Sequence, residues 1–70
     1  MQASDLNNIF TYHRPSSDQA KRYERLRAEA KVFAQSVNEL CPESREKSLA
    51  ITSIQESVMW ANASIALHEK

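Results

Sequence analysis

The sequence predicts an all-α protein in which a short helix precedes an antiparallel hairpin of two long helices. Three observations lead to this prediction: apolar residues recur at helical spacing, glycine is absent, and the only prolines, Pro15 and Pro42, separate the periodic segments. The 70 residues make a single domain, residues 1–70. A compact monomer of this size hides only ~60% of its unfolded surface, so its core is marginal.

Small chains of this kind rely on a disulfide, a metal or self-association. Cys41 is the only cysteine, and it cannot form a structural zinc site with the distant His13 and His68 alone. We therefore expect no metal and no cofactor, and self-association remains. No apolar run resembles a signal peptide or a membrane span, which with the single thiol favours a reducing cytosol and no membrane partner. Zero net charge argues against polymeric nucleic acid as a partner.

The first segment is predicted to form one or two turns of helix. Ser4 and Asp5 supply a cap at its start. The apolar residues that follow them lie at helical spacing: Leu6, Ile9 and Phe10.

The second segment is predicted to be a helix of some 24 residues, about 36 Å long at ~1.5 Å per residue. Ser16 and Gln19 form a capping-box signature, and Asp18 lies in the first turn, where the helix dipole favours an anion. An apolar stripe follows at helical spacing: Tyr23, Leu26, Ala30, Phe33, Val37 and Leu40. The helix is expected to end at Leu40, because the residue before Pro42 resists the helical conformation.

The third segment is predicted to be a helix from Pro42, as its first residue, to about His68. It carries two apolar stripes, which are Ile51, Ile54, Val58, Ala61 and Ile65, and Leu49, Ser53, Trp60, Ala63 and Leu67. One partner helix covers one stripe, so two stripes indicate two partners. We therefore expect an obligate oligomer of hairpins, in which Trp60 and Met59 meet another chain. In the alternative, the second stripe packs against the first short helix.

Catalysis finds little support in the residues. A hydrolase needs a nucleophile with a base beside it, or paired carboxylates. Cys41, at the bend, is interpreted as a small apolar plug. Glu24 and Glu29 each lie one helical turn from a basic residue and are interpreted as surface pairs. Without glycine there is no phosphate-cradling loop. We expect no enzyme activity and no catalytic residue.

Positive charge gathers at the start of the second helix. Six of the nine Lys and Arg residues lie between Arg14 and Lys31, and with three acids this segment carries +3. Tyr12 offers a flat face for a base, stiffened by Pro15 and flanked by His13, and base stacking contributes ~1–3 kcal/mol. An aromatic ring and arginines near a helix start suit a small nucleotide. In the alternative, the side chains of Tyr12 and His13 only pack onto the hairpin, and the basic residues form a solvated face.

Several stretches of the sequence are distinctive. They are Phe10-Thr11-Tyr12-His13-Arg14-Pro15, Gln19 with Arg22-Tyr23-Glu24, Cys41-Pro42-Glu43-Ser44-Arg45-Glu46-Lys47-Ser48-Leu49-Ala50, and Val58-Met59-Trp60-Ala61-Asn62-Ala63. Over roughly residues 9–68 the chain resembles the small helical-hairpin family of phage anti-CBASS proteins, which is grouped with the hairpin part of anti-Thoeris sponges.

The resemblance implies a sponge, which sequesters the cyclic oligonucleotide messengers of infected bacteria without cleaving them, so that the defence effector stays inactive. It implies hexamers of hairpins that hold cyclic dinucleotides between protomers, in the cytoplasm of the infected bacterial host. The family's stacking tyrosine matches Tyr12, and its phosphate-binding basic residue matches Arg27. His13, Pro15 and Lys31 are then expected to shape the pocket.

Two positions depart from the family pattern. Arg14 stands where many relatives have proline, which adds a positive charge at the pocket mouth. Leu67 stands where many have the arginine of a second, cyclic-trinucleotide pocket, so the resemblance does not imply that pocket here unless Arg45 or His68 substitutes. Two other functions also remain open: an adaptor whose second apolar stripe docks a protein partner, and a small nucleic-acid binder, which zero net charge disfavours.

Overall fold

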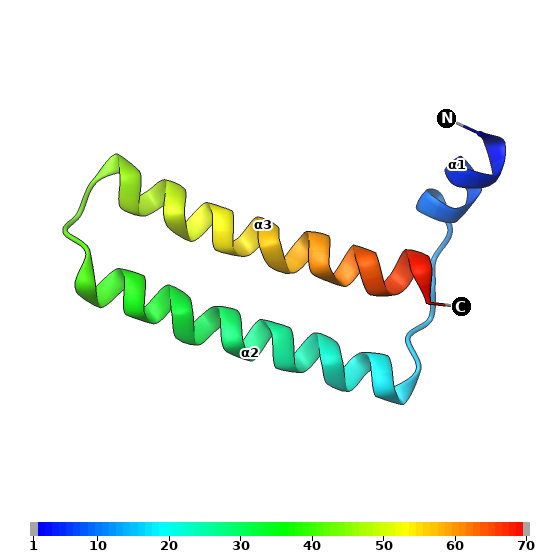
Figure 1. The fold of residues 1–70 in the computed structure, drawn as a ribbon, viewed down its shortest axis with the longest axis horizontal. Coiled ribbons are helices and arrows are strands. Elements are labelled where there is room, and N and C mark those ends of the chain that lie inside the picture. Colours follow the sequence, from blue (N-terminus) through cyan, green and yellow to red (C-terminus); the bar gives the residue numbers. More distant parts are fainter. Residues whose placement is uncertain (1, 70) are drawn as a thin grey trace.

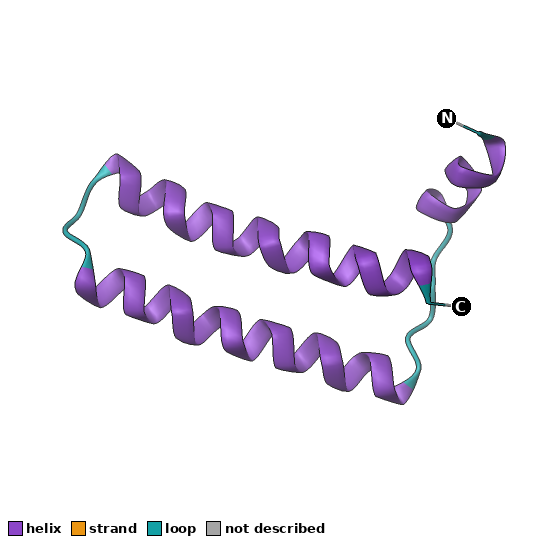
Figure 2. Cartoon of the chain, in the orientation of Figure 1, coloured by secondary structure: helices purple, strands orange, loops and turns teal. Residues whose placement is uncertain are grey.

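The computed structural model describes residues 2–69 and has the predicted all-helical fold, with α1 (Ala3–Phe10), α2 (Ser17–Leu40) and α3 (Arg45–His68). α2 and α3 lie antiparallel, and α1 projects from the end where α2 begins and α3 ends (Figures 1 and 2). The molecule is one layer thick, with extents of 45 × 29 × 13 Å. Its radius of gyration is 15.3 Å, whereas a compact chain of this length has about 11 Å. Within the described residues, no helix is both long and apolar enough to cross a membrane.

α1 begins one residue earlier than its predicted cap. Gln2 is the N-cap residue, so Ser4 lies inside the helix and its predicted capping role is wrong, whereas that of Asp5 is confirmed. The Asp5 carboxylate accepts a hydrogen bond from the Gln2 backbone N–H at 3.1 Å, which satisfies one donor that a helix start leaves free. Leu6, Ile9 and Phe10 are all exposed in the single chain, so α1 buries little of its apolar face.

α2 has the bounds that its capping and periodicity predict. The Gln19 backbone N–H donates to Ser16 Oγ at 3.1 Å, and the Ser16 N–H donates to Gln19 Oε1 at 3.0 Å, so the capping box is confirmed. The stripe from Tyr23 to Val37 is half-buried against α3 except at Phe33, which is exposed. Cys41 follows the helix and is exposed, so its interpretation as an apolar plug is wrong.

α3 begins at Arg45, and the predicted start at Pro42 is wrong. Ser44 is the N-cap, and its hydroxyl oxygen accepts the Lys47 backbone N–H at 3.1 Å. The same hydroxyl donates to the Pro42 carbonyl at 3.1 Å. A serine side chain that satisfies a first-turn N–H is a stronger start signal than a proline that only tolerates the first position. Pro42 and Glu43 therefore belong to the turn.

Lys47 fastens the turn between the two long helices. It is the one residue classed as buried among residues 2–69, with 9% of its surface exposed. Its Nζ donates to the Asn38 carbonyl at 2.9 Å and to Glu43 Oε1 at 2.6 Å. The ammonium thus satisfies a carbonyl in the last turn of α2, at the negative end of that helix.

Replacing Lys47 by methionine should lower the free energy of unfolding by about 1.5–3 kcal/mol, the usual contribution of hydrogen bonds that involve a charged group. The apolar stem is kept, so the loss reports the ammonium contacts. Urea unfolding of the variant is compared with Lys21→Met, which removes a charge from an exposed position. Equal stability of the two variants would show that the Lys47 contacts contribute nothing.

The two apolar stripes of α3 have different surroundings in one chain. The stripe from Ile51 to Ile65 is half-buried against α2 throughout. On the other stripe, Leu49 is exposed and Trp60 is 74% exposed, and the adjoining Met59 is exposed as well. α1 does not cover Trp60, so the alternative in which α1 packs over this stripe is wrong at its largest residue. Among residues 2–69, no apolar residue is fully buried in the single chain. Assembly through this face stays a prediction.

Candidate functional site

A groove of about 950 Å³ lies at the end of the hairpin where the α1–α2 loop meets α2 and α3. The loop contributes Tyr12, His13, Arg14 and Pro15 to its walls. The first turns of α2 and the last turn of α3 contribute the rest, Arg22 and Glu69 among them. The groove therefore brings a contiguous loop together with two helix ends that are distant in sequence.

The last turn of α3 fastens both sides of this loop. On the α1 side, Asn8 Nδ2 donates to the Leu67 carbonyl at 3.1 Å, and His13 Nε2 donates to the Asn8 carbonyl at 2.7 Å. On the α2 side, Gln19 Nε2 donates to the Glu69 carbonyl at 3.5 Å. The bonds from Asn8 and Gln19 satisfy carbonyls at the end of α3 that have no partner within the helix, and the bond from His13 satisfies a carbonyl near the end of α1. The loop is thus held at both ends.

Tyr12 lies at the unpacked tip of this anchored loop. The residue is 83% exposed, whereas His13 beside it is half-buried. The sequence alternative in which both rings pack onto the hairpin therefore fails for Tyr12. A large aromatic side chain presented to solvent in a groove is available to stack on a planar ligand.

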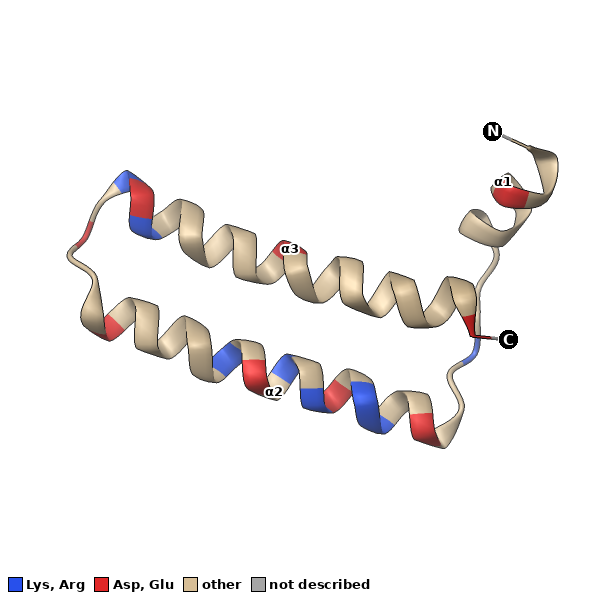
Figure 3. Ribbon diagram, viewed as in Figure 1, with Lys and Arg blue, Asp and Glu red and all other residues tan. Residues whose placement is uncertain are grey.

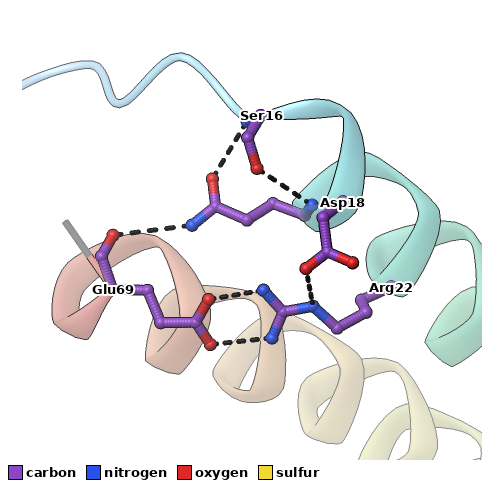
Figure 4. A network of polar contacts seen from close by, with 5 residues as sticks. Ser16, Asp18, Arg22 and Glu69 are labelled. Atoms are coloured by element: carbon purple, nitrogen blue, oxygen red, sulfur yellow. Dashed lines mark hydrogen bonds and ion pairs between the residues drawn. The ribbon is translucent and has the colours of Figure 1, made fainter.

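Arg22 is the centre of an ion-pair cluster in the same groove (Figure 4). Its Nη1 donates to Glu69 Oε2 at 2.7 Å and its Nη2 donates to Glu69 Oε1, so the carboxylate is bound in a two-pronged manner. Asp18 Oδ2 lies 3.1 Å from Arg22 Nε as an ion pair. The hydrogen bond with Glu69 is the main cause that raises the pKa of Arg22, and the same bond lowers the pKa of Glu69.

Positive charge lies on the loop and on α2 as far as Lys31, as the sequence indicates. Figure 3 shows that the last turns of α2 carry no Lys or Arg. Between Ser48 and His68, by contrast, Glu56 is the only Asp, Glu, Lys or Arg residue. Arg14 is exposed at the groove and makes no ion pair with any residue in the range 2–69. It is therefore a cation that an incoming anion could meet.

The predicted site residues fall in different places within one chain. Tyr12, His13 and Pro15 share the groove. Arg27 lines an adjoining groove of about 330 Å³ together with Asn62, and Lys31 lines neither groove. Arg27 lies ten residues beyond the start of α2, which is ~15 Å along the helix. Tyr23 and Ala66 line both grooves, so within one chain Tyr12 and Arg27 lie in neighbouring, connected grooves.

Sequence reasoning missed the cluster of Asp18, Arg22 and Glu69 as part of the site. The four-residue spacing of Asp18 and Arg22 was a visible signal for a pair on one helix face. Glu69 was harder to find, because it is 47 positions from Arg22 and reaches it only through the hairpin. Two antiparallel helices of 24 residues each nevertheless bring the end of one beside the start of the other. In residues 2–69, no group of three or more His, Cys, Asp or Glu is placed to hold a metal ion.

The fold and the groove define a class: a small helical hairpin that presents an exposed aromatic ring and arginines beside its free helix ends. The family model described as "Acb2/Tad1, hairpin domain" matches residues 2–66, and the chain belongs to this family. The family predicted from the sequence motifs is therefore confirmed. Membership suggests a sponge-type function against CBASS or Thoeris defence, in a family of binding proteins rather than enzymes. No curated protein and no solved structure matches the chain.

Proposed function

We propose that this protein binds cyclic dinucleotides in the cytoplasm of an infected bacterial host and sequesters them uncleaved, so that a CBASS effector stays inactive. The observation that carries the proposal is the exposed Tyr12 in a groove that also holds Arg14, which has no ion-pair partner among residues 2–69. A purine stacks on such a ring, and an arginine forms charge-assisted bonds to a phosphodiester. Membership of the Acb2/Tad1 hairpin family supports the same function.

The ligand is bound between copies of the chain in this proposal. Tyr12 and Arg27 line neighbouring grooves of one chain, which share Tyr23 and Ala66. Following the family resemblance, each ligand takes Tyr12 from one protomer and Arg27 from its partner. The uncovered apolar face around Trp60 supports a hexameric or other homo-oligomeric assembly. His13 and Pro15 form the wall beside the ring, and Lys31, one helical turn from Arg27, adds positive charge on its side.

A cyclic dinucleotide should stabilise the folded protein strongly. At about 100 times its dissociation constant, a ligand that binds only the native state adds ~2.7 kcal/mol to the free energy of unfolding. A thermal-shift screen over cyclic di- and trinucleotides measures this, with a linear dinucleotide of the same bases as the control. The cyclic trinucleotides test whether a second pocket is present although Leu67 replaces the family's arginine. If no cyclic nucleotide raises the melting temperature, the proposed function is wrong.

The bound ligand should be recovered intact. The protein is incubated with an excess of cyclic dinucleotide and then heat-denatured, and the released nucleotide is analysed by chromatography. Only the cyclic form is expected, because within residues 2–69 the groove's Ser16 hydroxyl accepts the Gln19 N–H and His13 Nε2 donates to the Asn8 carbonyl, so neither is paired as nucleophile and base. Linear product in more than stoichiometric yield would make the protein an enzyme.

An adaptor that docks a protein partner is the second candidate, because Met59 and Trp60 are both exposed on α3. Such a face also suits a second copy of this chain. An adaptor would show no thermal response to cyclic nucleotides, so the same screen separates the two functions.

A further inference from the structure

The Glu69 carboxylate accepts hydrogen bonds from the Arg22 guanidinium with the same two-pronged geometry that a ligand phosphate would use. The two nitrogens Nη1 and Nη2 each donate to one oxygen of the carboxylate (Figure 4). The same fork binds the two free oxygens of a phosphodiester, which is also a singly charged anion. Arg22 lines the groove that contains Tyr12, so its fork lies in the proposed nucleotide site.

The contact between Glu69 and Arg22 is exchangeable. The two side chains are 44% and 40% exposed, and an ion pair with that much contact with water contributes little to stability. Glu69 is also the C-cap residue of α3, where the helix dipole disfavours an anion. Within residues 2–69, Glu69 accepts one other hydrogen bond from across the groove. It is long, 3.5 Å, and runs from Gln19 Nε2 to the Glu69 backbone carbonyl, not to the carboxylate. Little besides Arg22 therefore holds the carboxylate in place.

The charge of the groove changes when Glu69 leaves. Among residues 2–69, the Lys, Arg, Asp and Glu residues that line it are Arg14, Arg22, Asp18 and Glu69, so their formal charges sum to zero with the carboxylate in place. Without that carboxylate the groove carries a net positive charge and a free guanidinium fork. An anionic ligand that displaces Glu69 thus creates the potential that favours its own binding.

We propose that Arg22 is a further phosphate-binding residue of the nucleotide site and that Glu69 is an internal competitor, which holds the guanidinium until a ligand displaces it. This inference rests on the proposed function. It assigns to Arg22 the phosphate of the nucleotide that stacks on Tyr12 of the same chain, while Arg27 belongs to the adjoining half-site. Affinity is then set in part by a residue that never contacts the ligand.

The test is a double-mutant cycle on the dissociation constant of a cyclic dinucleotide, measured by calorimetric titration. Glu69→Gln should tighten binding by about two- to fivefold, because it removes a competing exposed ion pair. Arg22→Gln should weaken binding by about tenfold or more, as expected for the loss of a charge-assisted hydrogen bond. In the Arg22→Gln background, Glu69→Gln should tighten binding less than it does in the wild type, because only its charge remains to be removed and the group for which it competes is gone.

Glu56→Gln is the matched control, since it removes one exposed carboxylate from α3 outside the groove. Arg22→Lys keeps the charge and loses the fork, so its binding should lie between those of wild type and Arg22→Gln. Oligomer size is measured for every variant. The inference is overturned, and the proposed function kept, if wild type binds and Glu69→Gln binds no tighter. It is also overturned if Glu56→Gln tightens binding equally. If neither wild type nor any variant binds a cyclic dinucleotide, the proposed function and this inference both fall.

Discussion

Trp60→Lys should break up the oligomer at micromolar concentration and lower the melting temperature sharply. The Trp60 side chain is 74% exposed in one chain, and Leu49 and Met59 on the same helix are exposed as well. Residues 2–69 contain no fully buried apolar side chain, so a single hairpin has no core of its own. Buried aromatic side chains dominate interface energies, and an unpaired ammonium in that position would add a large desolvation penalty. Folding and assembly are therefore expected to be lost together.

Sedimentation velocity and thermal unfolding measure these two effects. Trp60→Phe keeps a large ring and should keep the assembly, with a lower melting temperature. Gln55→Lys adds the same charge to a different face of α3 and should leave both measurements unchanged. A well-folded wild-type monomer at micromolar concentration would contradict the prediction outright. Normal assembly of the Trp60→Lys protein would mean that the interface lies elsewhere.

The helices could be predicted from the sequence because local signals agree with the apolar periodicity. Ser16 and Gln19 define the start of α2 by reciprocal hydrogen bonds, and Pro42 defines its end. The start of α3 was harder to predict from the sequence. Two start signals, Pro42 and Ser44, lie within three residues, and periodicity does not choose between them because the apolar stripe begins only at Leu49. The structure selects Ser44, whose hydroxyl accepts an N–H of the first turn.

The candidate site was predictable only where its residues are close in sequence. Tyr12, His13 and Pro15 share the groove because one short loop carries them. The pair of Arg22 and Glu69 depends on the register of the hairpin, which periodicity alone does not supply. The role proposed for Arg27 rests on the family resemblance and on assembly with a second copy of the chain, so neither periodicity nor the contacts within one protomer could supply it.

The paired variants Tyr12→Ala and Arg27→Ala should both weaken cyclic dinucleotide binding strongly while assembly is preserved. Loss of the ring should cost ~1–3 kcal/mol per stacked base, and Tyr12→Phe much less because its ring is kept. Arg27→Ala removes charge-assisted bonds to phosphate, at about 1.5–3 kcal/mol, and Arg27→Lys should be milder because the charge stays. Two protomers that share one ligand present each residue twice, so each substitution acts twice in one site.

Neither substitution should disturb the oligomer. Tyr12 lies in the loop before α2, and Arg27 is exposed beside the half-buried stripe through Tyr23 and Leu26. Binding by calorimetric titration must therefore be measured alongside oligomer size by sedimentation, so that a lost site is distinguished from a lost assembly. The sharpest control mixes the Tyr12→Ala and Arg27→Ala proteins. If each ligand takes Tyr12 from one protomer and Arg27 from its partner, mixed oligomers regain some intact sites and part of the binding. If the two variants assemble normally and each still binds within about twofold of wild type, a difference of only ~0.4 kcal/mol, the ligand does not lie between Tyr12 and Arg27.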